Sequence, residues 1–346
     1  MLRLAFVGAG AVVCDRHLPA LAHVGSVRVV GVADVDTDRA RAAAAQAGGV
    51  PVFESVEELL DAGGVDALAV CVPPRAHAHV ATAAARRGVH LFVEKPLAVP
   101  LADARATVAA AHESGVGGVT GFNLRCHRHV RAARTLLAAG ETGELVAVRA
   151  TFTDPLLDDG GLPDWRRSRE HGGGALWDKA VHHVDLWRHL LGDEIAELAA
   201  TTRSDPEADD SVTLLTGRTR AGVLLEAIAA DHGPVRQEIQ LIGRRATLEL
   251  DLYRSDGLRL VPPGELPGAV GTRLRGALHT ARSLSRLARD ARVGGVFRQA
   301  YTELWRSFGD AVRGREGTLA TLEDGLRAVE CLDAALAGSQ LAGACT

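Results

Sequence analysis

A carboxylate and an imidazole stand four residues apart in the segment 172–185, which reads GGGALWDKAVHHVD. Asp178 and His182 share one face if this segment is helical, because side chains four apart on a helix are neighbours. A carboxylate beside an imidazole fixes its tautomer and raises its basicity, as a general base acting on a hydroxyl requires. Asp185 could orient the imidazole instead, and a purely structural pair of this spacing is also common. The spacing therefore suggests proton transfer and leaves the alternatives open.

A second candidate for chemistry is the lysine in the segment 92–98, FVEKPLA. An apolar run ends on Glu94 and Lys95, and a proline follows at once. A surface turn is one interpretation. The other is a lysine held rigidly over a bound cofactor, because Pro96 restricts the backbone after Lys95 and allows a cis bond between them.

The histidines do not predict a metal site. His182 and His183 are adjacent, so they point about 100° apart on a helix. The pairs at 77/79 and 127/129 are only two residues apart, and no group has the spacing of a structural zinc site.

These residues need a scaffold, and the first part of the chain predicts one. Apolar runs at 2–7, 27–33, 67–72, 90–93 and 118–122 alternate with helical segments. Repeated strand–helix units of this size predict a parallel, doubly wound sheet, which binds ligands beyond the carboxyl ends of its strands.

A glycine turn follows the first predicted strand. Gly8 and Gly10 fit the dinucleotide fingerprint, although Val13 stands where a third glycine is usual. Asp34 ends the next strand, where a carboxylate accepts hydrogen bonds from the ribose 2′-hydroxyl and repels a 2′-phosphate. We therefore expect NAD, with NADP possible because Arg39 could soften that repulsion.

The pattern changes after residue 125. Alternation at 143–152 and hairpins at 211–228 and 238–253 predict an antiparallel sheet with helices on one face, and strong helices follow at 301–312 and 322–336. The sequence thus predicts an α/β protein with a Rossmann domain at 1–122 and a substrate-binding and oligomerisation domain at 123–346.

The segment 273–298 is rich in arginine. Leucines at 274, 278, 284 and 287 have near-helical spacing, with arginines at 275, 282, 286 and 289 largely on the other side. A solvated helix face is our first interpretation; anion binding, for example of a nucleotide-linked sugar, or a subunit contact are the alternatives.

Composition limits the class of function. The net charge of −4 favours neither nucleic acid nor an anionic membrane, and no apolar run approaches the length of a membrane span. The N-terminus lacks the pattern of a signal peptide. The cysteines are scattered and odd in number, which predicts that the protein works in a reducing cytoplasm. They are Cys14, Cys71, Cys126, Cys331 and Cys345.

The motifs VGAG, HLPAL, VPPRAH, GVHLFVEKPLA, GFNLR and GGGALWDKAVHHVD occur in this order. Together they resemble the Gfo/Idh/MocA oxidoreductases, the family of glucose–fructose oxidoreductase and inositol dehydrogenase, from residue 2 to about 192. The resemblance implies a Rossmann domain followed by a domain with a large, mostly antiparallel sheet. That sheet often carries oligomer contacts, so we expect a homo-oligomer, a dimer or a tetramer.

The resemblance also implies roles for individual residues. Lys95 matches a lysine that contacts the reacting oxygen and the nicotinamide ribose, and Asp178 and His182 complete a catalytic set. The cofactor-binding residues are then Gly8, Gly10, Ala11, Val12, Asp34, Pro73, His77, Glu94, Lys95 and Asn123. The substrate-binding residues are Arg125, Trp165, Arg166, Asp178, Lys179 and His182.

Lys179 and Ala180 depart from the family, which commonly has Leu-Gly there. Lys179 could reach an acidic substrate, and we expect it to face water instead. The implied activity is NAD(P)-dependent interconversion of a ring hydroxyl and a ketone on a sugar, nucleotide-linked sugar or cyclitol. The alternatives are an NAD-dependent glycosidase-like enzyme and a non-catalytic NAD(P)-binding regulator.

Overall fold

The computed structural model describes residues 1–264, 266, 268–292, 294–315 and 317–343. The chain forms two compact units, and three segments of the chain contribute to each. The first unit contains Met1–Cys126, Asp164–Gly173 and Tyr301–Asp333; the second contains His127–Pro163, Gly174–Ala300 and the chain after Asp333. The boundary expected between residues 122 and 123 stays a prediction.

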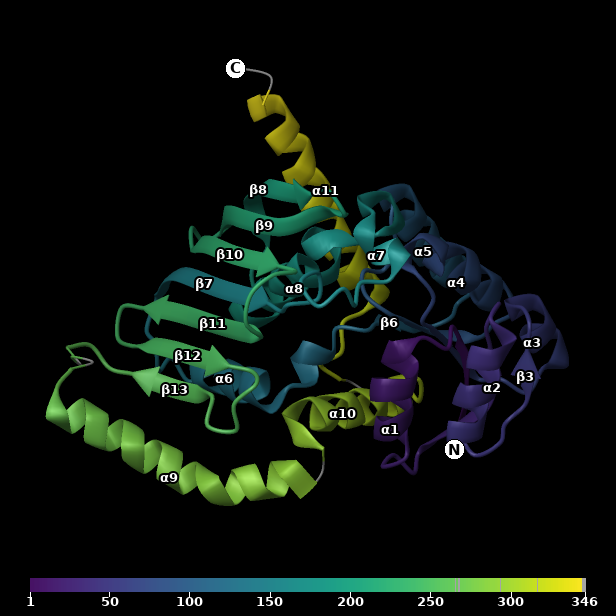
Figure 1. The fold of residues 1–346 in the computed structure, drawn as a ribbon, viewed down its shortest axis with the longest axis horizontal. Helices are drawn as coiled ribbons and strands as arrows, with labels where there is room; N and C mark the ends of the chain where they lie inside the picture. The colour runs from purple at the N-terminus through teal and green to yellow at the C-terminus, as the bar shows by residue number, and fades with distance from the viewer. Residues whose placement is uncertain (265, 267, 293, 316, 344–346) are drawn as a thin grey trace. The chain divides into compact units, whose positions relative to one another are not determined.

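The first unit is built on a six-stranded parallel sheet of order β3-β2-β1-β4-β5-β6. The strands are β1 (Leu2–Val7), β2 (Val27–Ala33), β3 (Val52–Phe53), β4 (Ala67–Val70), β5 (His90–Val93) and β6 (Gly118–Thr120). The connecting helices are α1 (Leu18–Leu21), α2 (Thr37–Gln46), α3 (Val56–Ala62), α4 (His77–Arg86) and α5 (Leu101–Glu113) (Figure 1). The predicted doubly wound sheet is confirmed.

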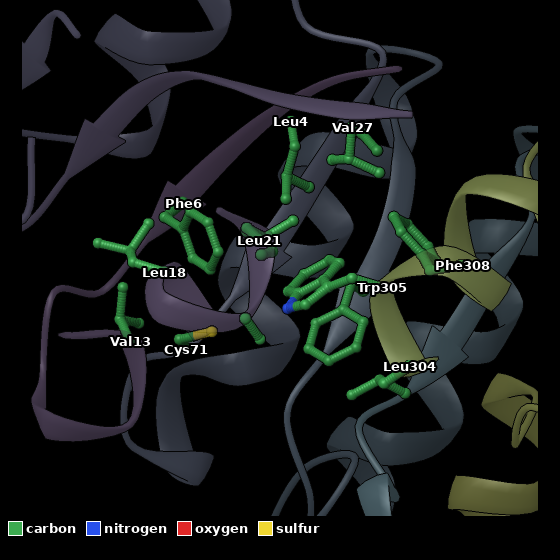
Figure 2. Close-up of a cluster of buried hydrophobic side chains, with 14 of the residues drawn as sticks. Leu4, Phe6, Val13, Leu18, Leu21, Val27, Cys71, Leu304, Trp305 and Phe308 are labelled. Atoms are coloured by element: carbon green, nitrogen blue, oxygen red, sulfur yellow. The ribbon is translucent and has the colours of Figure 1, made fainter. Parts of the chain in front are cut away.

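The core of the first unit joins its first strand to a helix from the far end of the sequence. Trp305, on α10 (Gly295–Ala311), packs edge-on against Phe6 of β1 and lies 4.5 Å from the ring of Phe92 of β5, measured between ring centroids. Figure 2 shows Trp305 and Phe308 among side chains of the sheet. Burial of these large rings explains why the second half of α10 packs with the N-terminal sheet.

The second unit is built on a seven-stranded sheet of order β13-β12-β11-β7-β10-β9-β8. The strands are β7 (Leu145–Thr153), β8 (Ile195–Asp205), β9 (Ala208–Thr219), β10 (Leu224–Ala230), β11 (Arg236–Gly243), β12 (Thr247–Asp251) and β13 (Leu258–Val261). Among the described strands of this second sheet, only β7 and β10 pair in parallel. Both predicted hairpins, β9–β10 and β11–β12, are confirmed.

The helices of the second unit lie along one side of this sheet in Figure 1. They include α6 (Arg128–Ala138) and α8 (Val181–Leu191), while α9 (Val270–Arg292) lies near the edge strand β13. The last helix, α11 (Leu322–Gly343), begins in the first unit. None of the described helices has the length and apolar character needed to cross a membrane. Cys14 and Cys71 carry free thiols, and Cys345 lies outside the described residues.

Candidate active site

The glycine turn follows β1, where the sequence predicted it. Gly8 has a φ of +97°, and a Cβ there would lie 2.4 Å from the carbonyl oxygen of Cys71, so only glycine fits. At Gly10 a Cβ would meet nothing within 4 Å, which leaves the backbone open to a ligand. Val13, at the third position of the fingerprint, is fully buried in the core (Figure 2).

Asp34 connects the end of β2 to this turn. Its Oδ2 accepts a hydrogen bond from the Ala9 amide at 2.6 Å, and its Oδ1 accepts one from the Asp36 amide at 2.8 Å. Arg39 pairs with Asp36 at 3.0 Å. The open turn and the adjacent carboxylate fit the pyrophosphate and ribose of a dinucleotide.

Glu94 lies buried at the end of β5 and is held from two sides. His17 Nε2 lies 3.1 Å from its Oε1, and the Lys95 amide donates to its Oε2 at 3.1 Å. Burial alone would raise the pKa of Glu94, but the hydrogen bond with His17 and the charges of His17 and Lys95 outweigh it and leave that pKa below its usual value. Glu94 is therefore ionised at neutral pH, beside the backbone that carries Lys95.

His17 is a residue of this site that sequence reasoning missed. It is completely buried among the rings of Phe6, Phe92, Tyr301 and Trp305. The motif HLPAL contains it, but nothing in that motif indicates a carboxylate partner 77 positions away.

His77 links the turns that follow β4 and β5. Its Nε2 lies 2.8 Å from the Val72 carbonyl oxygen, and its Nδ1 lies 2.9 Å from that of Pro96. Burial lowers the pKa of His77, so the ring is neutral at pH 7 and donates its single N–H to one of these carbonyls. The Lys95–Pro96 bond is cis. Both ring nitrogens of His77, which was expected at the cofactor, thus lie against main-chain carbonyl oxygens.

Further predicted residues of the first unit lie on short helical turns. Asn123 and Arg125 belong to the turn Asn123–Cys126, and the buried guanidinium of Arg125 pairs with Asp324 at 2.9 Å. The helix α7 (Asp164–Arg167) carries Trp165 and Arg166, with the guanidinium carbon of Arg166 lying 5.8 Å from the centroid of the Trp165 ring.

The glycine stretch that leads to Asp178 and His182 is confirmed as a loop that enters a helix. A Cβ at Gly173 would lie 2.3 Å from the Arg166 carbonyl oxygen, so the two backbones approach too closely for any other residue.

Asp178 and His182 belong to the second unit. The segment Leu176–Ala180, which carries Asp178, is a π-helical turn, and α8 begins only at Val181. The segment is therefore helical, as the spacing of Asp178 and His182 requires, but it is π-helical around Asp178, and such turns are frequent at functional sites. His182 is buried, and its ring centroid lies 6.1 Å from that of Phe152. Asp178 is half-buried.

Lys179 does not face water, and that expectation is wrong. Its side chain is 1% exposed, Nζ lies 2.9 Å from Asp154 Oδ1, and a second ion pair joins it to the buried Asp231. Asp154 follows β7 and Asp231 follows β10, two strands that pair in parallel. The sheet thus brings to Lys179 two carboxylates that its sequence neighbourhood does not contain.

Lys179→Met is expected to lower the free energy of unfolding by about 3–5 kcal/mol, because it leaves the buried Asp231 without its cation. Urea denaturation followed by circular dichroism measures this loss. The double variant Lys179→Met/Asp231→Leu should recover much of it, since replacing a whole buried pair is often neutral. Equal stability of Lys179→Met and the wild type would show that the ion pairs contribute nothing.

Residues 2–122 match the model described as an oxidoreductase family with an NAD-binding Rossmann fold, and residues 130–249 match the GFO/IDH/MocA C-terminal domain. The dTDP-3,4-didehydro-2,6-dideoxy-alpha-D-glucose 3-reductase of Streptomyces antibioticus is 33% identical over 72% of this chain and 75% of its own. The 1,5-anhydro-D-fructose reductase of Ensifer adhaerens is 36% identical over 59% of this chain and 61% of its own.

A solved structure extends the likeness over nearly the whole chain. GenD2 from gentamicin A biosynthesis, crystallised in complex with NAD, is 26% identical and has a TM-score of 0.79. The match covers 97% of this chain and 93% of that one.

Proposed function

This chain belongs to the Gfo/Idh/MocA family of NAD-dependent oxidoreductases, and from that premise we propose that it interconverts a ring hydroxyl and a ketone on a sugar, nucleotide-linked sugar or cyclitol. The observation that carries the proposal is Lys95 at the carboxyl end of β5, on a turn whose Glu94 is held by a buried histidine. The carboxyl ends of parallel strands are where such sheets bind their ligands.

The cofactor we propose is NAD. Gly8 and Gly10 would hold its pyrophosphate, and Asp34 would accept hydrogen bonds from the adenosine ribose. The bound nicotinamide supplies the hydride acceptor or donor. Ala11, Val12, Pro73, His77 and Asn123 complete the proposed cofactor residues.

In the oxidising direction His182 takes the proton from the substrate hydroxyl. Asp178 holds the imidazole and stabilises its charged form. The ammonium of Lys95 stabilises the negative charge that develops on the substrate oxygen. In reduction His182 returns the proton to that oxygen. Arg125, Trp165 and Arg166 are proposed substrate contacts; we do not assign Lys179 that role, because its ammonium is already held by two carboxylates.

A nucleotide-linked keto-sugar is the first substrate to test, since the relative that is 33% identical reduces a dTDP-linked one. We would assay dTDP- and UDP-linked sugars, free aldoses, 1,5-anhydro-fructose and myo-inositol with NAD(H) and NADP(H), following NADH absorbance. Turnover on one of these carbohydrates is the expected result. Tight NADH binding without any turnover would favour a regulator, and glycoside cleavage without net NADH change would favour the glycosidase-like alternative.

Asp34→Ala is expected to raise the ratio of kcat/KM for NADP to that for NAD by about tenfold, a change of about 1.4 kcal/mol. The substitution removes the carboxylate that would repel a 2′-phosphate, together with the hydrogen bond to Ala9. The matched control is Asp38→Ala on the exposed side of α2, which should leave the ratio unchanged. An unaltered ratio in Asp34→Ala would remove this residue from cofactor selection.

A further inference from the structure

Helix α9 presents its leucines to solvent. A surface helix ordinarily turns its apolar stripe toward the core. In α9 the large apolar side chains are instead between 53% and 74% exposed: Val270, Leu274, Leu278, Leu284 and Leu287. An exposed apolar stripe of this length is typical of a surface that another molecule covers.

The polar side of α9 fixes this orientation. Asp290 is buried and receives two hydrogen bonds from the Arg128 guanidinium, at 2.6 and 2.7 Å, and one from the Ser255 hydroxyl at 2.6 Å. His279 Nε2 donates to the Asp256 carbonyl oxygen at 3.0 Å, and Thr280 donates to the Asp256 carboxylate at 3.0 Å. Rotating the helix to bury the leucines would break these contacts and expose a buried ion pair.

The spacing of the outward residues indicates what covers them. Val270, Leu274, Ala277, Ala281 and Leu284 are separated by four, three, four and three residues, which is the a/d pattern of a helix that pairs with another helix. The two alanines, both exposed, allow a close approach of the helix backbones.

The positions that flank this seam carry one charge, that of Arg273. In the same heptad they are Gly271, Arg273, Leu278, Thr280, Ser285 and Leu287, while the arginines at 275, 282, 286 and 289 fall at positions away from the seam. From Leu278 onward, two copies of the helix can therefore approach without opposing like charges at the positions that set partner choice. A self-complementary surface of this kind forms a two-fold interface between identical chains.

We propose that the outward face of α9 is a self-association surface, on which α9 of a second copy of this chain packs through Val270, Leu274, Ala277, Leu278, Ala281, Leu284 and Leu287. This contact is separate from the sheet contacts that the family resemblance implies. It does not depend on the proposed enzymatic activity.

The test is the solution mass of two variants, measured by size-exclusion chromatography with light scattering. Leu274→Glu/Leu278→Glu/Leu284→Glu should halve the mass of the wild-type oligomer, because it places charges in the seam and beside it. The control Arg275→Glu/Arg282→Glu makes a comparable charge change away from the seam and should keep the wild-type mass. Circular dichroism checks that both variants fold.

Hydrogen–deuterium exchange of the wild type provides a second, substitution-free measurement. Amides of residues 270–287 should be protected at high protein concentration and exchange faster on dilution as the mass falls. The proposal is overturned if the wild type is a monomer, if the leucine variant keeps the wild-type mass, or if exchange in α9 is independent of concentration. If the leucine variant loses binding to anionic vesicles but keeps the wild-type mass, the outward face of α9 binds membranes, and this result also overturns the proposal.

Discussion

Lys95→Met lowers kcat by about 10²–10³ on the preferred substrate, which is the usual loss when one group that stabilises an oxyanion is removed. Methionine keeps the length of the side chain and removes the charge. The Lys95 side chain takes no part in the Glu94–His17 hydrogen bond or in the contacts of His77 with main-chain carbonyls. The turn that follows β5 should therefore keep its conformation in this variant. Stopped-flow measurement of the NADH signal in a single turnover gives the rate of the chemical step.

The control for this prediction is Lys95→Arg, which retains the charge and should be less impaired than Lys95→Met. The affinity of both variants for NADH, measured by fluorescence titration, shows whether the cofactor still binds. A near-native single-turnover rate in Lys95→Met, with NADH bound normally, would remove Lys95 from the chemistry.

His182→Ala should reduce kcat by about 10²–10⁴, the usual contribution of a positioned general base. The dependence of kcat on pH should also lose its acidic limb, because the group whose deprotonation creates the base is gone. Steady-state assays across the pH range measure both effects.

Asp178→Asn should impair kcat more than KM, since it removes the charge that stabilises the imidazolium.

Two neighbouring histidines help to interpret that pH profile. Burial lowers the pKa of His183 to about 4, so His183 is neutral through the range where a histidine base titrates. His189, farther along α8, supplies the control variant His189→Ala, which should keep both the rate and the acidic limb. An unchanged limb in His182→Ala would place the base on another residue.

Local sequence pattern was enough to predict both sheets. The apolar runs and the glycine turn specify the parallel strands of the first unit, and alternation specifies the hairpins β9–β10 and β11–β12. These features depend on residues close together in the sequence, which is why periodicity reveals them. The strands β8 and β13 were not predicted, because neither is a run of alternating residues as clear as those in the hairpins.

Contacts between residues far apart in the chain could not be predicted from the sequence. Lys179 is paired with Asp231, 52 positions away, and His17 with Glu94, 77 positions away. A lysine is rarely buried unless it is paired, so an isolated lysine is reasonably expected at the surface. Only the parallel pairing of β7 and β10 brings the carboxylates to it. The π-helical turn at Asp178 likewise has no signature in residue spacing.

The central claim is that hydride passes between the nicotinamide and a ring carbon of a carbohydrate. It is tested most directly by incubating the protein with NADH deuterated at the transferable position and the ketone forms of the carbohydrates in the substrate panel, followed by mass spectrometry. We predict a product that gains one deuterium at the reduced ring carbon, with the transfer strongly slowed in Lys95→Met and His182→Ala. If the protein binds NADH and none of these ketones gains deuterium, the account is contradicted.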